Sequence, residues 1–355
     1  MTKTILRTIT SVSLLVFTGV LLLLANLLDS FFFSFYPDLS RGIIKVLAGV
    51  TSIFPFALFE ILIVGLVVWF IFTLVRAIIK ARMVRWLTGV LLSVCILVTA
   101  FVSIWGLNYY APPMDERLGL ERRQYTVEEL TEATKYYRDM ANTLSSQVKR
   151  GADGVMVEYD FEKLSDAAGE GYETLAQRYD CFDGSTVGVK KLISSPLMGK
   201  IGTTGVFLCL TGESTVSTTT HAASMPFTMC HEIGHRMAFA REDEANFAGF
   251  LACAANERPE FRYSGYYAAF RYCYNALYDA DPSAAAAVWS GVSENVATDW
   301  GASVVHYEAI RSETASEVSD AVYDTYLKSF SVESGVQSYG EVTDLLLAWY
   351  FGGNR

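Results

Sequence analysis

The segment His231-Glu-Ile-Gly-His235 combines residue types and a spacing that suit a metal-dependent hydrolase. Two histidines four positions apart on a helix project from the same face, so both imidazoles can reach one metal ion. Glu232 lies between them and can contact a water molecule beside the ion without being a ligand. Pro226 suits the first turn of such a helix, because the N–H that proline lacks would have no partner there. The segment therefore predicts a helix that carries a zinc site and a general base.

A catalytic zinc site needs a third protein ligand, and residues 241–246 offer two carboxylates for this role. Glu242 and Asn246 share one helix face, so Glu242 can bind the metal while Asn246 orients one of the histidines. Glu244 points to roughly the opposite side of the same helix and is the alternative ligand. The two carboxylates therefore cannot bind the same ion together, and Glu242 is the preferred third ligand.

The third ligand also requires a turn in the chain. An uninterrupted helix would carry Glu242 about 10 Å along the axis from His235. The chain must therefore turn near residues 238–241 and return as a second helix. The sequence predicts one zinc ion per chain, bound by His231, His235 and Glu242.

Further candidate residues lie outside this segment. Peptide hydrolysis needs a hydrogen-bond donor for the oxyanion, and His306 and Tyr339 are candidates, although both can equally be hydrogen-bonded core residues. His221 is either an exposed loop histidine or a substrate contact. Residues 203–220 form either an ordinary strand or the strand with which an extended substrate pairs.

The composition separates the chain into two parts. It has 355 residues, of which 52% are hydrophobic and 19% charged, and this excludes disorder, a collagen repeat and a coiled coil. Residues 1–110 hold 8 Lys+Arg and 3 Asp+Glu, a net charge of +5, whereas residues 111–355 hold 20 and 35, a net charge of −15. The acidic second part lacks the basic patch that binds phosphates, so nucleic acid is not an expected partner.

The first part is predicted to be a transmembrane anchor, residues 1–110. Three apolar stretches are long enough to cross a hydrocarbon core of about 30 Å, and helices satisfy their own backbone hydrogen bonds in lipid. These stretches are residues 9–28, 57–79 and 86–107. Residues 43–56 are apolar but short, and either lie at the interface or re-enter the membrane.

Charges beside the spans predict their orientation. Basic residues flank the N-terminus and the link between the second and third spans: Lys3, Arg7, Arg76, Lys80, Arg82 and Arg85. The positive-inside rule places both regions in the cytoplasm. Three crossings then place the outer domain, residues 111–355, outside the cytoplasmic membrane.

The outer domain is predicted to be mainly helical with a small sheet. Thr126 and Glu129 form a capping box that starts a helix reaching about Arg150. A second helix is expected over residues 161–179, strands within 186–193 and 203–220, and helices from Pro226 onward. The five cysteines of this domain have no CxxC spacing, and small buried side chains with at most one disulfide are expected.

Several segments resemble known families. An HExxH helix followed by a helix with Glu-x-x-x-Asp is similar to the gluzincin metallopeptidases, although Asn246 replaces the Asp here. More narrowly, the chain resembles a family of bacterial three-pass membrane proteins of unassigned function with a zincin-like outer domain. The further segments that carry this resemblance are Trp105–Pro113, Arg241–Phe247, Tyr263–Tyr266, Tyr326–Lys328 and Gly335–Tyr339. The resemblance implies a membrane-anchored zinc peptidase with a zincin-like α+β domain.

These observations favour one function and leave two alternatives. The favoured function is a zinc-dependent metallopeptidase of the bacterial cytoplasmic membrane, acting on a peptide or protein in or near the cell envelope. The first alternative is a catalytically inactive sensor or scaffold with a zincin fold that binds a cell-envelope partner. The second is a transport component, although three spans with a single marginal acid offer little polar pathway.

Overall fold

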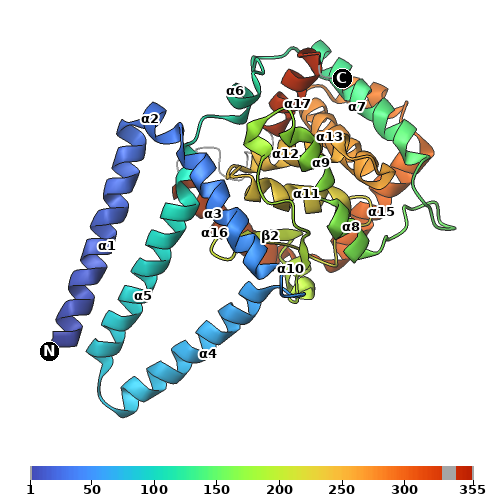
Figure 1. Ribbon diagram of the computed structural model, residues 1–355. Coiled ribbons are helices and arrows are strands. Elements are labelled where there is room, and N and C mark those ends of the chain that lie inside the picture. Colours follow the sequence, from blue (N-terminus) through green and yellow to red (C-terminus); the bar gives the residue numbers. More distant parts are fainter. Residues whose placement is uncertain (1, 330–340, 354–355) are drawn as a thin grey trace.

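Three long apolar helices extend from one side of a larger helical domain in the computed structural model, which describes residues 2–329 and 341–353 (Figure 1). They are α1 (Thr2–Leu27), α4 (Leu58–Ile79) and α5 (Met83–Ile104), and each is long and apolar enough to cross a membrane. The prediction of three spans is confirmed. The third span ends before residue 107, because a 3₁₀ helix, η1 (Gly106–Tyr110), follows it.

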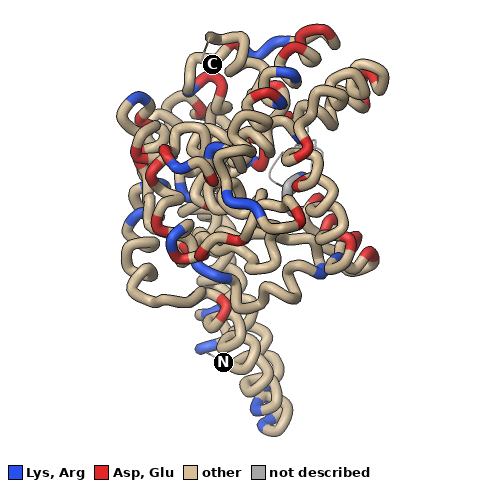
Figure 2. Tube along the Cα trace, turned by 90° about the vertical axis from the view of Figure 1, so that its right-hand side faces the viewer, with Lys and Arg blue, Asp and Glu red and all other residues tan. Residues whose placement is uncertain are grey.

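The N-terminus and the loop between α4 and α5 lie at the same end of the spans. The Arg7 guanidinium donates to the Arg85 carbonyl at 2.7 Å, and the hydroxyls of Thr18 and Thr99 lie 2.9 Å apart where α1 packs on α5. Figure 2 shows Lys and Arg, but no Asp or Glu, at this end, whereas acidic residues are spread over the outer domain. The basic end of the anchor therefore points away from the outer domain.

Residues 43–56, for which two placements were open, belong mostly to a helix that packs on the outer domain. This helix is α3 (Tyr36–Thr51), preceded by α2 (Asp29–Phe33). Its buried face includes Arg41 and Ile44, and its last residue, Thr51, donates to the carbonyl of Thr211 at 3.1 Å. Helix α3 therefore connects the spans to the outer domain, and contacts cross the predicted boundary at residue 110.

Two predicted helices of the outer domain, over about 126–150 and 161–179, differ from the structure at one boundary and at one break. Helix α7 (Val127–Ser145) begins at the capping box of Thr126 and Glu129, as predicted, but ends before residue 150. The single helix expected over 161–179 is wrong, since it is divided into α8 (Phe161–Ala167) and α9 (Glu170–Ala176). The break allows α9 to approach α12 closely, where a Cβ at Gly171 would overlap the carbonyl of Ala252.

The sheet is small and has three strands. They are β1 (Lys190–Lys191), β2 (Gly205–Leu208) and β3 (Glu213–Val216), in the order β1-β3-β2. Strand β3 pairs parallel to β1 and antiparallel to β2, with Gly205 opposite Val216 and Leu208 opposite Glu213. Strand β2 is therefore an edge strand, paired with another strand on one side only among the described residues.

The described residues from Pro226 onward are mainly helical, as predicted. The C-terminal helix α17 packs on α7, α12 and α13, so both ends of the outer domain share one core. All six cysteines are buried and unpaired, and the structure contains no disulfide. The remaining helices are α6 (Met114–Leu118), η2 (Asp180–Phe182), α10 (Ser195–Lys200), α11 (Met225–Arg236), α12 (Glu242–Ala255), α13 (Pro259–Ala280), α14 (Pro282–Trp289), α15 (Glu294–Ile310), α16 (Glu313–Ser329) and α17 (Val342–Phe351).

Two carboxylates fasten the second span to the outer domain. Glu213 of β3 is buried and accepts hydrogen bonds from the N–H groups of Leu58 and Phe59, at 2.8 and 2.9 Å. It also pairs with Lys190 at 2.6 Å. In the opposite direction, Glu60 of the span accepts from the N–H groups just before α10, at residues 193 and 194. The start of α4 is therefore held directly against the sheet.

We expect Glu213→Ala to destabilise the protein by about 3 kcal/mol or more, because it leaves the Lys190 charge and two helix N–H groups buried without a partner. The measurement is the free energy of unfolding, or the apparent unfolding temperature, of the full chain in detergent micelles. Glu162→Ala is a matched control, because Glu162 pairs with the neighbouring Lys191 on the exposed surface and its loss should cost less than about 1 kcal/mol. Equal stability of the two variants would contradict this account of Glu213.

Candidate metal and catalytic site

The predicted site is built on two consecutive helices, α11 and α12. Pro226 lies in the first turn of α11, as expected, and the helix presents His231 and His235 from one face. The chain turns after Arg236, and Ala238 adopts a left-handed conformation with φ of 67°. This turn returns the chain so that α12 begins at Glu242, beside the two histidines.

The three predicted ligands converge on one small volume. The metal-binding atoms of His231, His235 and Glu242 all lie within 4.8 Å of one another. Nε2 of His231 is 3.4 Å from Oε2 of Glu242, and Nε2 of His235 is 3.7 Å from Oε1. Nδ1 of His235 lies 2.8 Å from the carbonyl of Phe239, and when it donates there it leaves the Nε2 lone pair free for a metal.

The donor set fits a divalent zinc ion. Two imidazole nitrogens and one carboxylate form one of the ligand sets that catalytic zinc uses, and they leave a position open for substrate or water. All three side chains are nearly buried, and an unpaired buried carboxylate is costly unless a cation lies beside it. The residues present therefore could hold the metal that the sequence predicts.

The pKa values of the ligands depend on their mutual contacts. Burial alone would raise the pKa of Glu242, but the hydrogen bond from His231 and the charge of His235 lower it to about 2. Burial lowers the pKa of His235 to about 4 against the opposing effect of Glu242. Burial also acts to lower the pKa of His231, but the hydrogen bond and charge of Glu242 outweigh it and raise the value. Glu242 is therefore ionised at neutral pH and available as a ligand.

Glu232 lies beside the ligands with one oxygen uncommitted. The residue is 3% exposed, and its Oε2 atom has no hydrogen-bond partner among the described residues. A Cβ at Gly205 would overlap the other oxygen, so only glycine allows β2 to pass this close. The backbone of Glu232 is held by a hydrogen bond of 2.6 Å from the Ser214 hydroxyl to its carbonyl. Burial raises the pKa of Glu232 to about 8.

Asn246 and Glu244 occupy different environments on α12. The Asn246 side chain helps to raise the pKa of His231, but neither its Nδ2 atom nor Nδ1 of His231 has a hydrogen-bond partner of normal geometry among the described residues, so its role in orienting a histidine stays a prediction. Glu244 instead accepts a hydrogen bond of 2.8 Å from the N–H of Met114. The structure thus brings Glu242, and not Glu244, together with the two histidines.

A cavity of about 980 Å³ lies over these residues. Its lining includes His231, Glu232, His235 and Glu242, together with strand β2 and one face of α16. The end of the third span also contributes, through Phe101 and Trp105. A cavity of this size accommodates several residues of a peptide or a small ligand.

One of the two candidate oxyanion donors, His306, is hydrogen-bonded away from the cluster. Nε2 of His306 lies 2.6 Å from the carbonyl of Thr219, and His306 is absent from the cavity lining, which fits the alternative of a hydrogen-bonded core residue. Tyr339 lies outside the described residues. His221, expected in an exposed loop or at the substrate, is buried, with its ring centroid 5.7 Å from that of His306. These two histidines form a separate contact between the 217–224 segment and α15.

Two tyrosines that the sequence reasoning missed line the cavity instead. Tyr323 of α16 donates a short hydrogen bond to Oε1 of Glu242, and Tyr272 of α13 lines the wall nearby. Neither residue lies in a motif, and both are more than 25 positions from the HEIGH segment. No local signal therefore identified them, because only the packing of α16 and α13 brings them to the site.

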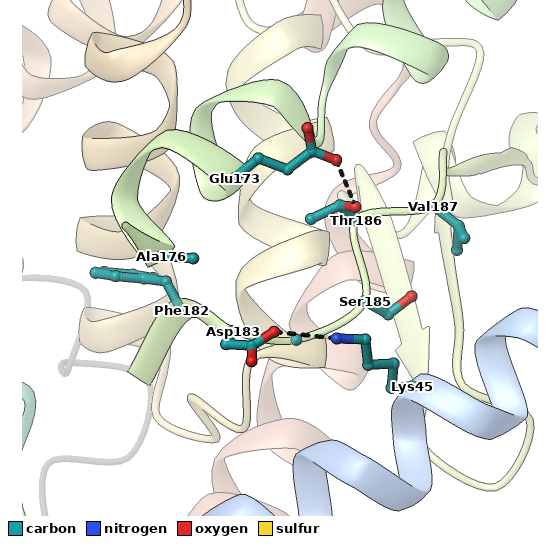
Figure 3. Close-up of a pocket in the computed structure, with 9 residues that line it drawn as sticks. Lys45, Glu173, Ala176, Phe182, Asp183, Ser185, Thr186 and Val187 are labelled. Atoms are coloured by element: carbon teal, nitrogen blue, oxygen red, sulfur yellow. Dashed lines mark hydrogen bonds and ion pairs between the residues drawn. The ribbon is translucent and has the colours of Figure 1, made fainter. Parts of the chain in front are cut away.

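A smaller cavity of about 280 Å³ lies elsewhere, between α3 and the segment that follows α9 (Figure 3). Its polar groups already have partners, since Lys45 pairs with Asp183 at 3.0 Å and Thr186 donates to Glu173 at 2.9 Å. These partners are largely exposed, and the cavity contains no group that suggests chemistry. The candidate site is therefore the larger cavity.

Tyr323→Phe is expected to weaken zinc binding by roughly 10–100-fold, because the hydroxyl holds the carboxylate of Glu242 in place from outside the ligand set. Competition with a chromophoric chelator would measure the affinity. The control is Tyr278→Phe, which removes the hydroxyl of an exposed tyrosine on α13 and should leave the affinity unchanged. Unchanged affinity in Tyr323→Phe would show that the hydroxyl does not support the ligand.

Comparison with known proteins gives one match. The sequence matches, over residues 35–347, the family described as "Protein of unknown function (DUF3810)". No curated protein and no solved structure matches the chain. The match covers α3, the second and third apolar helices and the site, so these two helices and the outer domain are parts of the same family unit.

Proposed function

The chain belongs to this DUF3810 family of unknown function, and we propose that it is a membrane-anchored zinc metallopeptidase. One observation carries the proposal. The side chains of His231, His235 and Glu242 offer ligand atoms within 4.8 Å of one another, beside a buried Glu232, in the wall of a large cavity. Peptide hydrolysis uses this combination of a ligand set, a general base and a space for substrate.

When bound by these three residues, zinc supplies a Lewis acid that polarises the peptide carbonyl and makes water a better nucleophile at neutral pH. The first role of the chain is to hold this ligand set in place. Phe239 and Tyr323 do so from outside, through hydrogen bonds to His235 and Glu242.

Glu232 is the proposed general base. Its uncommitted Oε2 atom accepts the proton of the attacking water and then delivers it to the amine that leaves. This role requires the carboxylate form at the start. A divalent cation beside Glu232 favours that form by lowering its pKa, which burial otherwise raises to about 8.

Strand β2 is proposed to align the substrate. Its residues line the cavity, and β3 occupies only one of its edges. An extended peptide that pairs with the open edge receives backbone hydrogen bonds independent of its side chains.

The fold and its orientation complete the proposal. A zincin-like arrangement is supported by the HEIGH helix packed against both β3 and the helix that begins with Glu242. The basic end of the spans supports a cytoplasmic N-terminus, and a bacterial location follows from the resemblance of the sequence. The outer domain then lies outside the cytoplasmic membrane.

The test is zinc-dependent turnover by the purified full chain. The protein is reconstituted in lipid nanodiscs, its metal content is measured, and a mixture of unstructured peptides is searched by mass spectrometry for new termini. Cleavage that a chelator abolishes and added zinc restores supports the proposal. Zinc at about one ion per chain without any cleavage favours instead a sensor or scaffold that binds a cell-envelope protein.

A further inference from the structure

The third span forms part of the wall of the cavity that contains the metal cluster. Phe101 belongs to α5, Trp105 follows its last residue, and both line the cavity together with His235. The ring centroid of Trp105 is 6.0 Å from that of His235. Phe207 of β2 contacts both, with its ring centroid 4.9 Å from that of Trp105 and 6.1 Å from that of His235. The span end and a predicted metal ligand are therefore neighbours.

This contact sets the level of the cluster relative to the membrane. Helix α5 has 22 residues and is about 33 Å long at 1.5 Å per residue, close to the thickness of the hydrocarbon core. Its end, which Trp105 follows, is therefore placed at the membrane–water interface by the length of the helix. His235, in contact with Trp105, lies at the level of the lipid headgroups.

The start of the second span gives independent support for placing the metal cluster at the level of the lipid headgroups. Leu58 and Phe59, the first residues of α4, donate to Glu213 of β3. Strand β3 is paired with β2, which lines the cavity. Exposed apolar residues precede the span, with Ile53 77% exposed. The sheet beside the metal cluster is thus attached where α4 enters the membrane.

The outer wall of the cavity is also apolar. Helix α16 lines it with Ala315, Val318 and Val322, which fall on one helix face, beside the polar Ser319 and Asp320, the latter paired with Arg311. The two valines remain 61% and 67% exposed. A peptide lying between this helix and β2 therefore meets apolar side chains on both sides.

We propose that the substrate is a polypeptide anchored in the same membrane, and that it is cut within a few residues of its anchor. The inference rests on the proposed peptidase function and specifies its substrate class. A bond near an anchor is already at the level of the cluster, whereas a bond in a soluble chain must be brought to the lipid surface. An extended chain covers about 3.3–3.6 Å per residue, so ten residues would span about 35 Å. A bond at the level of the headgroups needs a shorter connection, so fewer than about ten residues separate the anchor and the cleavage site.

The experiment compares spacer lengths in liposomes that contain the full chain. Each test peptide consists of an anchor, a spacer and a randomised sequence. The anchor is either a palmitoyl chain or a transmembrane segment, and the spacer has about five or about twenty-five residues. Every peptide is concentrated on the membrane to the same extent, so concentration alone cannot produce a difference. We expect cleavage near the anchor to be at least about tenfold faster with the short spacer.

A second readout does not depend on turnover. Peptides with a photoreactive group near the anchor are cross-linked to Glu232→Gln, which should retain the metal. Short-spacer peptides should label residues 201–209 and α16, while long-spacer peptides should label them much less. The palmitoyl and transmembrane arms distinguish a lipid-anchored from a membrane-spanning source.

Matched variants test the cavity wall. Val322→Lys should slow cleavage of short-spacer peptides by about tenfold, because it places a charge on the apolar wall. Val305→Lys is the control, since Val305 is also 67% exposed but lies on α15 outside the cavity lining. A reduction in both variants, or in neither, would count against the assignment of this wall.

The outcomes separate the two proposals. Cleavage that is independent of spacer length would overturn the anchored-substrate inference and leave the peptidase function standing. Spacer-dependent cross-links without cleavage by the wild-type chain would overturn the peptidase function and retain the anchored polypeptide as the ligand class. Neither cleavage nor spacer-dependent cross-linking would overturn both.

Discussion

Glu232→Gln is expected to reduce peptide hydrolysis by about 10²–10⁴-fold while zinc remains bound. Glutamine has nearly the same shape as glutamate but cannot accept the proton of the attacking water. The side chain is buried and its Oε2 atom makes no hydrogen bond among the described residues, so the substitution breaks no contact of that atom. The measurement is the rate of peptide cleavage by nanodisc preparations with equal zinc content.

The control makes the same Glu-to-Gln substitution at a neighbouring buried glutamate. Glu244→Gln alters a buried glutamate on α12 that binds the N–H of Met114 and does not contact the ligand cluster. It should retain most of the activity. Wild-type turnover by Glu232→Gln would contradict the assigned mechanism, and equal loss in both variants would indicate damage to the fold.

Glu242→Ala is expected to lower zinc content from about one ion per chain to near zero under conditions that saturate the wild type. The carboxylate is the negative member of the ligand set, and its loss leaves two imidazoles that bind zinc only weakly. Metal analysis after dialysis against a weak chelator would measure this. His235→Ala should give the same result, because its Nε2 atom lies 3.7 Å from the carboxylate.

The zinc prediction also has a stability readout. A metal that binds only the folded chain stabilises it, by about 4 kcal/mol when zinc is present at a thousand times its dissociation constant. Chelation should therefore lower the apparent unfolding temperature of the wild type and leave that of Glu242→Ala unchanged. If Glu244→Gln loses the metal and Glu242→Ala keeps it, the alternative ligand is correct.

The helices of this protein could be predicted from the sequence where residues close together in the chain determine them. The three spans follow from apolar length, and α7 starts at the capping box because Thr126 and Glu129 satisfy helix N–H groups by themselves. The division between α8 and α9 was indicated only weakly, by Gly169 and Gly171, which lower the helical tendency of residues 161–179. The close approach of Gly171 to the carbonyl of Ala252, more than 80 positions away, could not be predicted.

The same distinction holds for the site. His231, Glu232 and His235 share one helix, and Glu242 follows after a short turn, so their grouping is a consequence of short-range geometry. The partners from other elements were missed. Tyr323 reaches Glu242 because α16 packs over the cavity, and His306 lies outside the cavity lining, where it bonds to the Thr219 carbonyl.

The sequence by itself therefore determined the chemistry available to this protein and its attachment to a membrane. Helical periodicity places ligands a few residues apart on one face, and an apolar stretch of sufficient length is stable as a span in lipid. Only the tertiary structure decided where that chemistry lies. The contact between Trp105 and His235, and the hydrogen bonds of Glu213 to the start of α4, join residues more than 100 positions apart and hold the cluster beside the ends of two apolar helices. Such contacts arise from packing between elements, and no periodicity or spacing in the chain encodes them.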